Sequence, residues 1–90
     1  METLKTIEFY TSPDGSVYYK VPGQESRRLT KFNVDIIDPL LGQIKQRFPE
    51  CYAALACKYR NKRFDMADRF IRCNFGEHDL LTQDIDNDVL

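Results

Sequence analysis

Apolar and polar residues alternate along residues 6–22, on both sides of a strong turn signal. The turn is Ser12-Pro13-Asp14-Gly15, whose proline and glycine suit a type I turn followed by a bulge with positive φ. Pairing across this turn places Tyr10 opposite Tyr18 on one face. The other face is apolar and consists of Ile7, Phe9, Thr11, Val17, Tyr19 and Val21. We therefore predict a β-hairpin whose apolar face is covered by helices, because an isolated hairpin is only marginally stable in water.

A helical repeat replaces this alternation further along the chain. Apolar residues recur at spacings of three and four, at Val34, Ile37, Leu41, Ile44 and Phe48. The repeat passes through Pro39, where we expect a bend, and Pro49 is well placed to begin the next helix. The pattern predicts three helices, over about 34–48, 49–60 and 63–75.

The third predicted helix is the most apolar of the three. Its polar strip is narrow, so we expect it to be the buried centre of the domain, with Cys73 as a small core side chain. Residues 77–90 are acidic without a sustained period, which predicts a loose tail. The predicted fold class is α+β: an N-terminal β-hairpin packed on three α-helices in one domain over 1–76, followed by an acidic C-terminal tail over 77–90.

Composition excludes several classes of protein. The chain has 90 residues, of which 42% are hydrophobic and 30% charged, a balance unlike that of a disordered chain. It lacks the roughly 18-residue apolar run of a membrane span and the apolar region of a signal peptide, so we expect a cytoplasmic protein without membrane contact. Three cysteines are an odd number in a leaderless chain, which favours reduced thiols over a disulfide framework.

Charge is unevenly distributed behind a formal net charge of −1. Six basic and two acidic residues lie within 57–73, whereas 76–90 holds five acidic residues and no Lys or Arg. A basic run with an interleaved aromatic is typical of nucleic-acid contacts, and its candidate residues are Lys58, Arg60, Lys62 and Arg63. The alternative is a solvated surface that complements the end of the second helix, with nearby i,i+4 ion pairs, Asp65 with Arg69 and Asp68 with Arg72. Because the total charge is balanced, we expect weak affinity for nucleic acid at most.

The sequence contains no motif specific for metal binding, cofactor binding or catalysis. Residues 84–88 imitate the start of an EF-hand loop, but Val89 stands where that loop requires glycine. Cys51 and the cysteine six residues later lie on different sides of one predicted helix, and Cys73 with His78 has no recognised ligand spacing. We therefore expect a protein that is not an enzyme and uses no cofactor or metal.

Tyr10 and Tyr18 are the candidate protein-interaction residues. They face each other on the outer side of the predicted hairpin, where a tyrosine pair serves either as an interface anchor or as a cross-strand stabiliser. Free edges on both hairpin strands would favour the interface, because such edges pair with other chains. The expected partner is another protein or a second copy of this chain.

Three segments together resemble a known family. They are Thr6–Gly15, Asp35–Leu55 and Asp68–Glu77, the last with the run Arg-Phe-Ile-Arg-Cys-Asn-Phe-Gly-Glu. They are similar to the N-terminal region of helix-turn-helix transcriptional regulators of Bacteroides-type bacteria, in which a Cys-containing linker and a LuxR-type DNA-binding domain follow. The resemblance covers about residues 5–80 and implies a non-enzymatic accessory domain for protein interaction or self-association in a bacterial transcriptional regulator.

This chain ends at Leu90, before any such linker or DNA-binding domain. Nucleic-acid binding is therefore expected only through that absent domain, or weakly through the basic run. The alternative function is a small nucleic-acid-binding module that uses residues 58–63.

Overall fold

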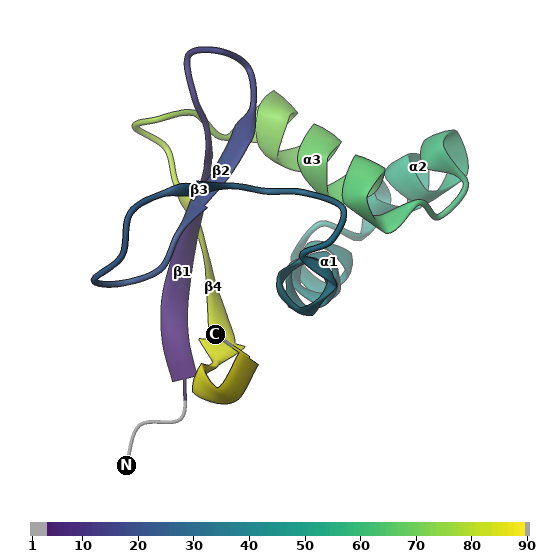
Figure 1. Ribbon diagram of the computed structural model, residues 1–90. Coiled ribbons are helices and arrows are strands. Elements are labelled where there is room, and N and C mark those ends of the chain that lie inside the picture. Colours follow the sequence, from purple (N-terminus) through teal and green to yellow (C-terminus); the bar gives the residue numbers. More distant parts are fainter. Residues whose placement is uncertain (1–3, 90) are drawn as a thin grey trace.

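The computed structural model describes residues 4–89 and consists of a four-stranded antiparallel sheet beside three helices (Figure 1). The strands are β1 (Leu4–Thr11), β2 (Val17–Lys20), β3 (Arg27–Arg28) and β4 (Leu81–Asp86). The helices are α1 (Val34–Arg47), α2 (Pro49–Tyr59) and α3 (Arg63–Asn74), and a short 3₁₀ helix, η1 (Asn87–Val89), follows β4. The predicted α+β class, with an N-terminal hairpin and three helices, is confirmed.

The hairpin of β1 and β2 has the predicted register. Phe9 pairs with Tyr19 and Tyr10 pairs with Tyr18. The turn closes as its sequence requires, because Gly15 has a φ of 86° and its N–H donates to the Ser12 carbonyl at 2.9 Å. Alternation along the two strands then buries one face of the hairpin and leaves the other without a helix against it.

The predicted loose tail over 77–90 is wrong for the residues that form β4. This strand pairs with β1 from Leu4↔Asp86 to Phe9↔Leu81, so it belongs to the domain and no boundary falls at residue 76. Leu81 and Ile85 lie four residues apart on one face of the strand, and both are buried. Two large apolar side chains are enough to fix the strand on the core, although acidic residues outnumber them nearby. Leu90, the last residue of the predicted tail, lies outside the described residues.

The prediction of free edges on both hairpin strands is therefore wrong. The strand order is β3-β2-β1-β4, which places β1 in the middle of the sheet. β3 pairs with part of β2, opposite Tyr18 and Tyr19. The outer strands of the sheet are β3 and β4, and neither was expected from the sequence.

The helices form layers on one side of the sheet (Figure 1). α1 and α3 pack against the strands, and α2 packs on α1 and α3, farther from the sheet. α1 runs through Pro39 as predicted, and Pro49 begins α2 directly after α1 has ended. α2 contributes no fully buried residue, but one side of it packs against the core with Tyr52, Leu55, Ala56 and Tyr59.

The core lies between the sheet and the two inner helices. α1 contributes five buried side chains, Ile36, Ile37, Leu40, Leu41 and Ile44, and α3 contributes four, Met66, Ala67, Phe70 and Ile71. The expectation that α3 alone is the buried centre is therefore wrong, because α1 shares that role. Val34, the first residue of the predicted apolar stripe of α1, is 47% exposed.

Candidate functional site

Among residues 4–89, no helix packs against one face of the sheet, and we call it the open sheet face. It consists of the side chains that alternate away from the core: Leu4, Thr6, Glu8 and Tyr10 on β1, Tyr18 and Lys20 on β2, Arg28 on β3, and Thr82, Asp84 and Asp86 on β4. All of them are exposed or half-buried. The face therefore remains available for contact with another molecule.

Tyr10 and Tyr18 form an aromatic pair on the open sheet face. Their ring centroids lie 6.1 Å apart with an angle of 22° between the ring planes. Such offset stacking fixes both rings in one orientation on neighbouring strands. Arg28 lies opposite Tyr18 on β3 and extends the row toward that edge of the sheet.

Charge is divided across the open sheet face. The basic residues Arg28 and Lys20 lie on β3 and β2, whereas the acidic residues Asp84 and Asp86 lie on β4 at the other edge. Glu8 on β1 lies opposite Lys20 in the strand register. On the acidic side, the Thr6 hydroxyl donates to the Asp84 carboxylate at 2.6 Å, which holds that carboxylate in position. The face thus carries an aromatic row and two regions of opposite charge.

The basic run lies where α2 ends and α3 begins. Lys58 lies in the last turn of α2, Arg60 caps its end, and Lys62 precedes α3. Arg60 and the next residue, Asn61, both have left-handed backbone conformations, with φ values of 53° and 62°. Two successive left-handed residues turn the chain sharply between the helices, so the basic residues occupy an exposed corner.

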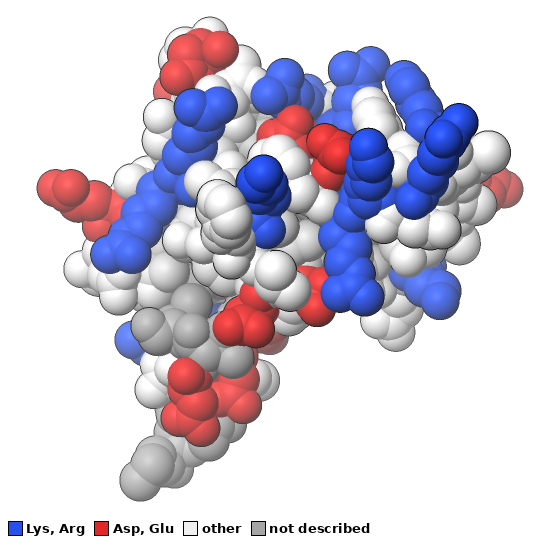
Figure 2. Space-filling view, turned by 45° about the vertical axis from the view of Figure 1, so that its right-hand side comes forward, with Lys and Arg blue, Asp and Glu red and all other residues white. Residues whose placement is uncertain are grey.

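Only part of this basic surface is paired. Figure 2, in which the helical side is turned forward, shows Lys and Arg side chains spread over this side with fewer acidic ones between them. Arg63 forms an ion pair with Asp38 of α1 at 2.9 Å. The predicted pair of Asp68 with Arg72 is confirmed at 2.9 Å, whereas the ion pairs of residues 4–89 do not include Asp65 with Arg69.

The surroundings of Asp68 shift its titration. Its side chain is only 18% exposed and lines a groove of about 340 Å³ between the β3–α1 connection and α3. Burial raises the pKa of the Asp68 carboxyl above its ordinary value, and the Arg72 guanidinium offsets part of that rise. Asp65 adds to the rise because it is a second negative charge on the same helix.

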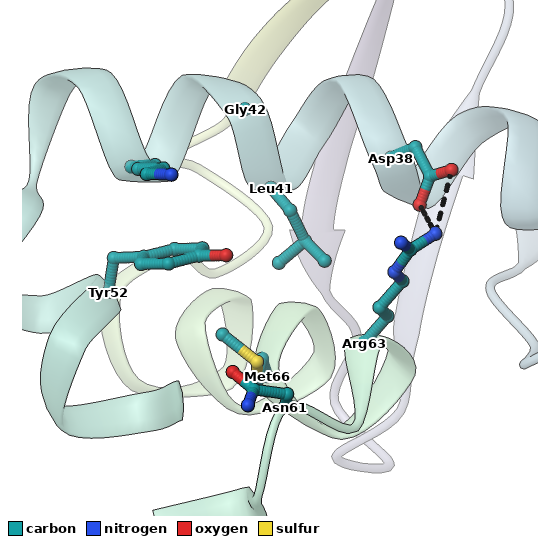
Figure 3. A pocket seen from close by; sticks show the side chains of 8 residues that line it. Asp38, Leu41, Gly42, Tyr52, Asn61, Arg63 and Met66 are labelled. Atoms are coloured by element: carbon teal, nitrogen blue, oxygen red, sulfur yellow. Dashed lines mark hydrogen bonds and ion pairs between the residues drawn. The ribbon is translucent and has the colours of Figure 1, made fainter. Parts of the chain in front are cut away.

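A cleft between α1 and the α2–α3 corner was missed in the sequence analysis. Figure 3 shows its walls, which are formed by Asp38, Leu41, Gly42, Lys45, Tyr52, Asn61, Arg63 and Met66. Its volume is about 440 Å³. One signal was present in the sequence: Gly42 lies inside a helical repeat, where glycine costs roughly 0.5–1 kcal/mol relative to alanine and calls for a reason.

The cysteines do not form a core element or a metal centre. Cys73, expected in the core, is exposed, because it lines a groove between α2 and α3 instead of the interface of α3 with the sheet. Cys51 and Cys57 are also exposed and free. Within residues 4–89, no group of three or more His, Cys, Asp or Glu side chains is arranged to hold a metal ion.

Comparisons of the chain with family models, curated proteins and solved structures gave no match. The part of the chain that the structure describes contains no helix that is both long enough and apolar enough to cross a membrane.

Proposed function

We propose that this chain is a non-enzymatic accessory domain that mediates protein interaction, through the open sheet face, in a bacterial transcriptional regulator. The observation that carries the proposal is the stacked pair of Tyr10 and Tyr18 on a sheet face that no helix covers. Tyrosines provide large contact areas at low cost in conformational entropy, and interfaces are enriched in them. The regulatory setting rests on the resemblance of the three sequence segments described above.

The division of charge favours a second copy of the chain as the partner. A two-fold axis that lies parallel to the face and runs along the line between the basic and the acidic region brings Arg28 and Lys20 of one copy to the side of Asp84 and Asp86 of the other. One surface then serves both copies.

The size of the face sets the expected affinity. Four strands at about 4.8 Å spacing, with the longest about 25 Å in length, give roughly 400 Å² per copy. This is about half of the ~800 Å² per partner that a standard interface buries. We therefore expect weak association, which appears only at high protein concentration.

Sedimentation analysis or light scattering of the purified chain, from about 10 µM to about 1 mM, tests the proposal. The average mass of the wild type should rise with concentration, and a Tyr10→Ala/Tyr18→Ala variant should remain monomeric. Phe32→Ala is the matched control, because Phe32 is an 81% exposed aromatic outside the open sheet face. A wild type that stays monomeric contradicts self-association and assigns the face to a different protein partner.

Charge reversal tests the pairing of the two copies. Lys20→Glu should weaken association, because two acidic regions then meet across the axis. Adding Asp84→Lys to the same chain restores opposite charges between copies and should recover much of the association. If the double variant associates no better than the single one, the proposed orientation is wrong.

A second candidate function is weak nucleic-acid binding by the α2–α3 corner. Lys58, Arg60 and Lys62 are exposed, and none of them takes part in an ion pair with the described residues. Titration of labelled duplex and single strands at low and at ~0.15 M salt tests this function. Binding that survives the higher salt and is lost in an Arg60→Ala/Lys62→Ala variant would favour it over protein interaction.

A further inference from the structure

Three separate segments build the cleft between α1 and the α2–α3 corner. α1 forms one wall with Asp38, Gly42 and Lys45, which lie four and three residues apart and therefore share one side of the helix. Tyr52 of α2 and the start of α3 form the opposite wall (Figure 3). Leu41 and Met66, both buried, supply apolar surface at its base. A volume of about 440 Å³ is in the range of small-molecule sites.

Gly42 lines this cleft without a side chain. Glycine lowers the stability of a helix interior relative to alanine. Packing does not require glycine here, because a β-carbon built on Gly42 has no neighbouring atom within 4 Å. Its φ does not lie in the left-handed region that glycine favours either. A larger side chain at this position would therefore extend into free space beside the cleft.

The polar groups of the cleft favour a negatively charged ligand. The Lys45 ammonium lies 5.7 Å from the centroid of the Tyr52 ring and forms no ion pair with the described residues. The Arg63 Nη1 atom donates to both Asp38 oxygens, at 2.9 and 3.1 Å, which fixes the guanidinium at the rim. One carboxylate and two cations leave the cleft with a net positive charge, and Arg63 keeps further N–H groups for a ligand.

Hydroxyl and amide groups add hydrogen-bonding capacity. Figure 3 shows the Tyr52 side chain extending between α1 and α3, with its hydroxyl toward the middle of the cleft. This hydroxyl takes part in none of the hydrogen bonds formed by the side chains of residues 4–89. The Asn61 side chain also lines the cleft, and its backbone is in the left-handed conformation. Such a conformation persists only where the surrounding structure stabilises it.

We propose that this cleft binds a small organic anion, a carboxylate or a phosphate ester with a short apolar body. The anionic group would lie between Lys45, Arg63 and the Tyr52 hydroxyl, and the apolar body would cover Leu41 and Met66. The proposal does not depend on the open sheet face, because the cleft is built by the helices alone.

Titrations of ¹⁵N-labelled protein, followed by amide chemical shifts, test the proposal. The probes are benzoate, phenyl phosphate and the neutral benzyl alcohol, which share one ring and differ in the charged group. The two anions should shift amides of α1 near Gly42 and of the α2–α3 corner in a saturable way. Benzyl alcohol should bind at least about tenfold more weakly, because it lacks the charge-assisted hydrogen bonds. The stronger of the two anions identifies the ligand class.

Two variants with a matched control separate the cleft from general surface charge. Lys45→Gln should weaken benzoate and phenyl phosphate about tenfold. Lys58→Gln is the control, because Lys58 also lies over a tyrosine ring, 5.5 Å from the Tyr59 centroid, but outside the cleft. It should leave both affinities unchanged. Equal losses in the two variants would overturn the site.

Gly42 provides a test that leaves all charges in place. Gly42→Leu should abolish the saturable shifts by filling the cleft, and Gly42→Ala should weaken them less. Neither variant should melt below the wild type, because both remove a helix-interior glycine and the position is open. Unchanged binding in Gly42→Leu, or equal binding of the neutral probe, would overturn the proposal. The Gly42 variants should leave the dependence of the average mass on protein concentration unchanged. Anion binding in the cleft and self-association through the open sheet face can therefore fail separately.

Discussion

Phe9 of β1 lies directly opposite Leu81 of β4, and both side chains are buried, with exposed fractions of 0% and 3%. This pair joins the first strand to the last one and places the C-terminal segment beside the hairpin. β4 also contacts α1, so the segment closes the core on the side that β2 does not reach. The acidic C-terminal stretch is therefore a structural part of the domain.

Ile85→Ala should destabilise the domain strongly. Ile85 is 1% exposed, and truncating a buried isoleucine costs about 2–5 kcal/mol by loss of burial and creation of a cavity. Urea unfolding followed by circular dichroism measures the loss. The control is Thr82→Ala on the outward face of the same strand, which should cost within ~0.5 kcal/mol. Equal, small effects of both variants would show that β4 does not hold the core.

The elements that could be predicted are those in which the hydrophobic period agrees with the turn or capping residues at their ends. The hairpin register followed from strict alternation combined with a turn that only Gly15 could complete. The helix boundary at Pro49 followed from proline chemistry in the same way. β4 was missed because only Leu81 and Ile85 mark its core face, too few for a period to emerge.

The sites were less predictable than the fold, because they depend on distances between segments. Tyr10 and Tyr18 could be paired in advance, since strand register alone brings them together. The cleft could not, because it combines α1, α2 and the start of α3. Cys73 was placed wrongly for a related reason: helical period shows which residues share a side, but not which neighbour covers that side.

Phe70→Ala should be the most damaging single truncation in α3. Phe70 is 3% exposed, and its ring lies 5.2 Å from Phe48 and 5.9 Å from Phe75 between centroids. Removing a buried phenylalanine costs about 3–5 kcal/mol, a large share of the roughly 5–15 kcal/mol that stabilises a small domain. We expect a largely unfolded chain at 37 °C, visible as lost amide dispersion in NMR spectra.

A control for this variant lies three residues further along the same helix. Cys73→Ser changes an exposed side chain and should alter the free energy of unfolding by no more than ~0.5 kcal/mol. If Phe70→Ala lost less than about 1 kcal/mol, the aromatic cluster of α3 would not be a main source of stability.

Asp68→Asn should change how stability depends on pH. Burial raises the folded-state pKa of Asp68 above the unfolded value, so the charged carboxylate opposes folding. This destabilisation is fully present above the pKa of Asp68 in the folded chain. It disappears as the pH falls below the pKa of Asp68 in the unfolded chain. The stability of Asp68→Asn relative to the wild type should therefore increase as the pH rises through that window.

Urea unfolding at several pH values between about 3 and 7 measures this difference. Thr82→Ala is the control, because it changes an exposed side chain without a titratable group. Its stability should stay parallel to that of the wild type over the whole range. A difference between Asp68→Asn and the wild type that falls with rising pH would show that the Arg72 ion pair outweighs burial.

Arg60→Gly should stabilise the domain. Arg60 caps the end of α2 with φ 53° and ψ 45°, a left-handed conformation that costs a residue with a β-carbon roughly 1–2 kcal/mol. Glycine adopts it without that cost. Its greater conformational freedom in the unfolded chain cancels part of the resulting stabilisation. We expect a net gain of about 0.5–1 kcal/mol in the free energy of unfolding, measured by urea titration.

Arg60→Ala separates the backbone effect from the loss of the guanidinium. Alanine keeps the β-carbon, and with it the left-handed strain, but removes the same positive charge that glycine removes. The difference between the two variants therefore reports the cost of the left-handed conformation minus the effect of glycine's greater freedom in the unfolded chain, without a contribution from charge. Equal stabilities of Arg60→Gly and Arg60→Ala would mean that the corner relaxes out of the left-handed region. In that case the sharp turn that carries Asn61 toward the cleft would not be imposed by the fold.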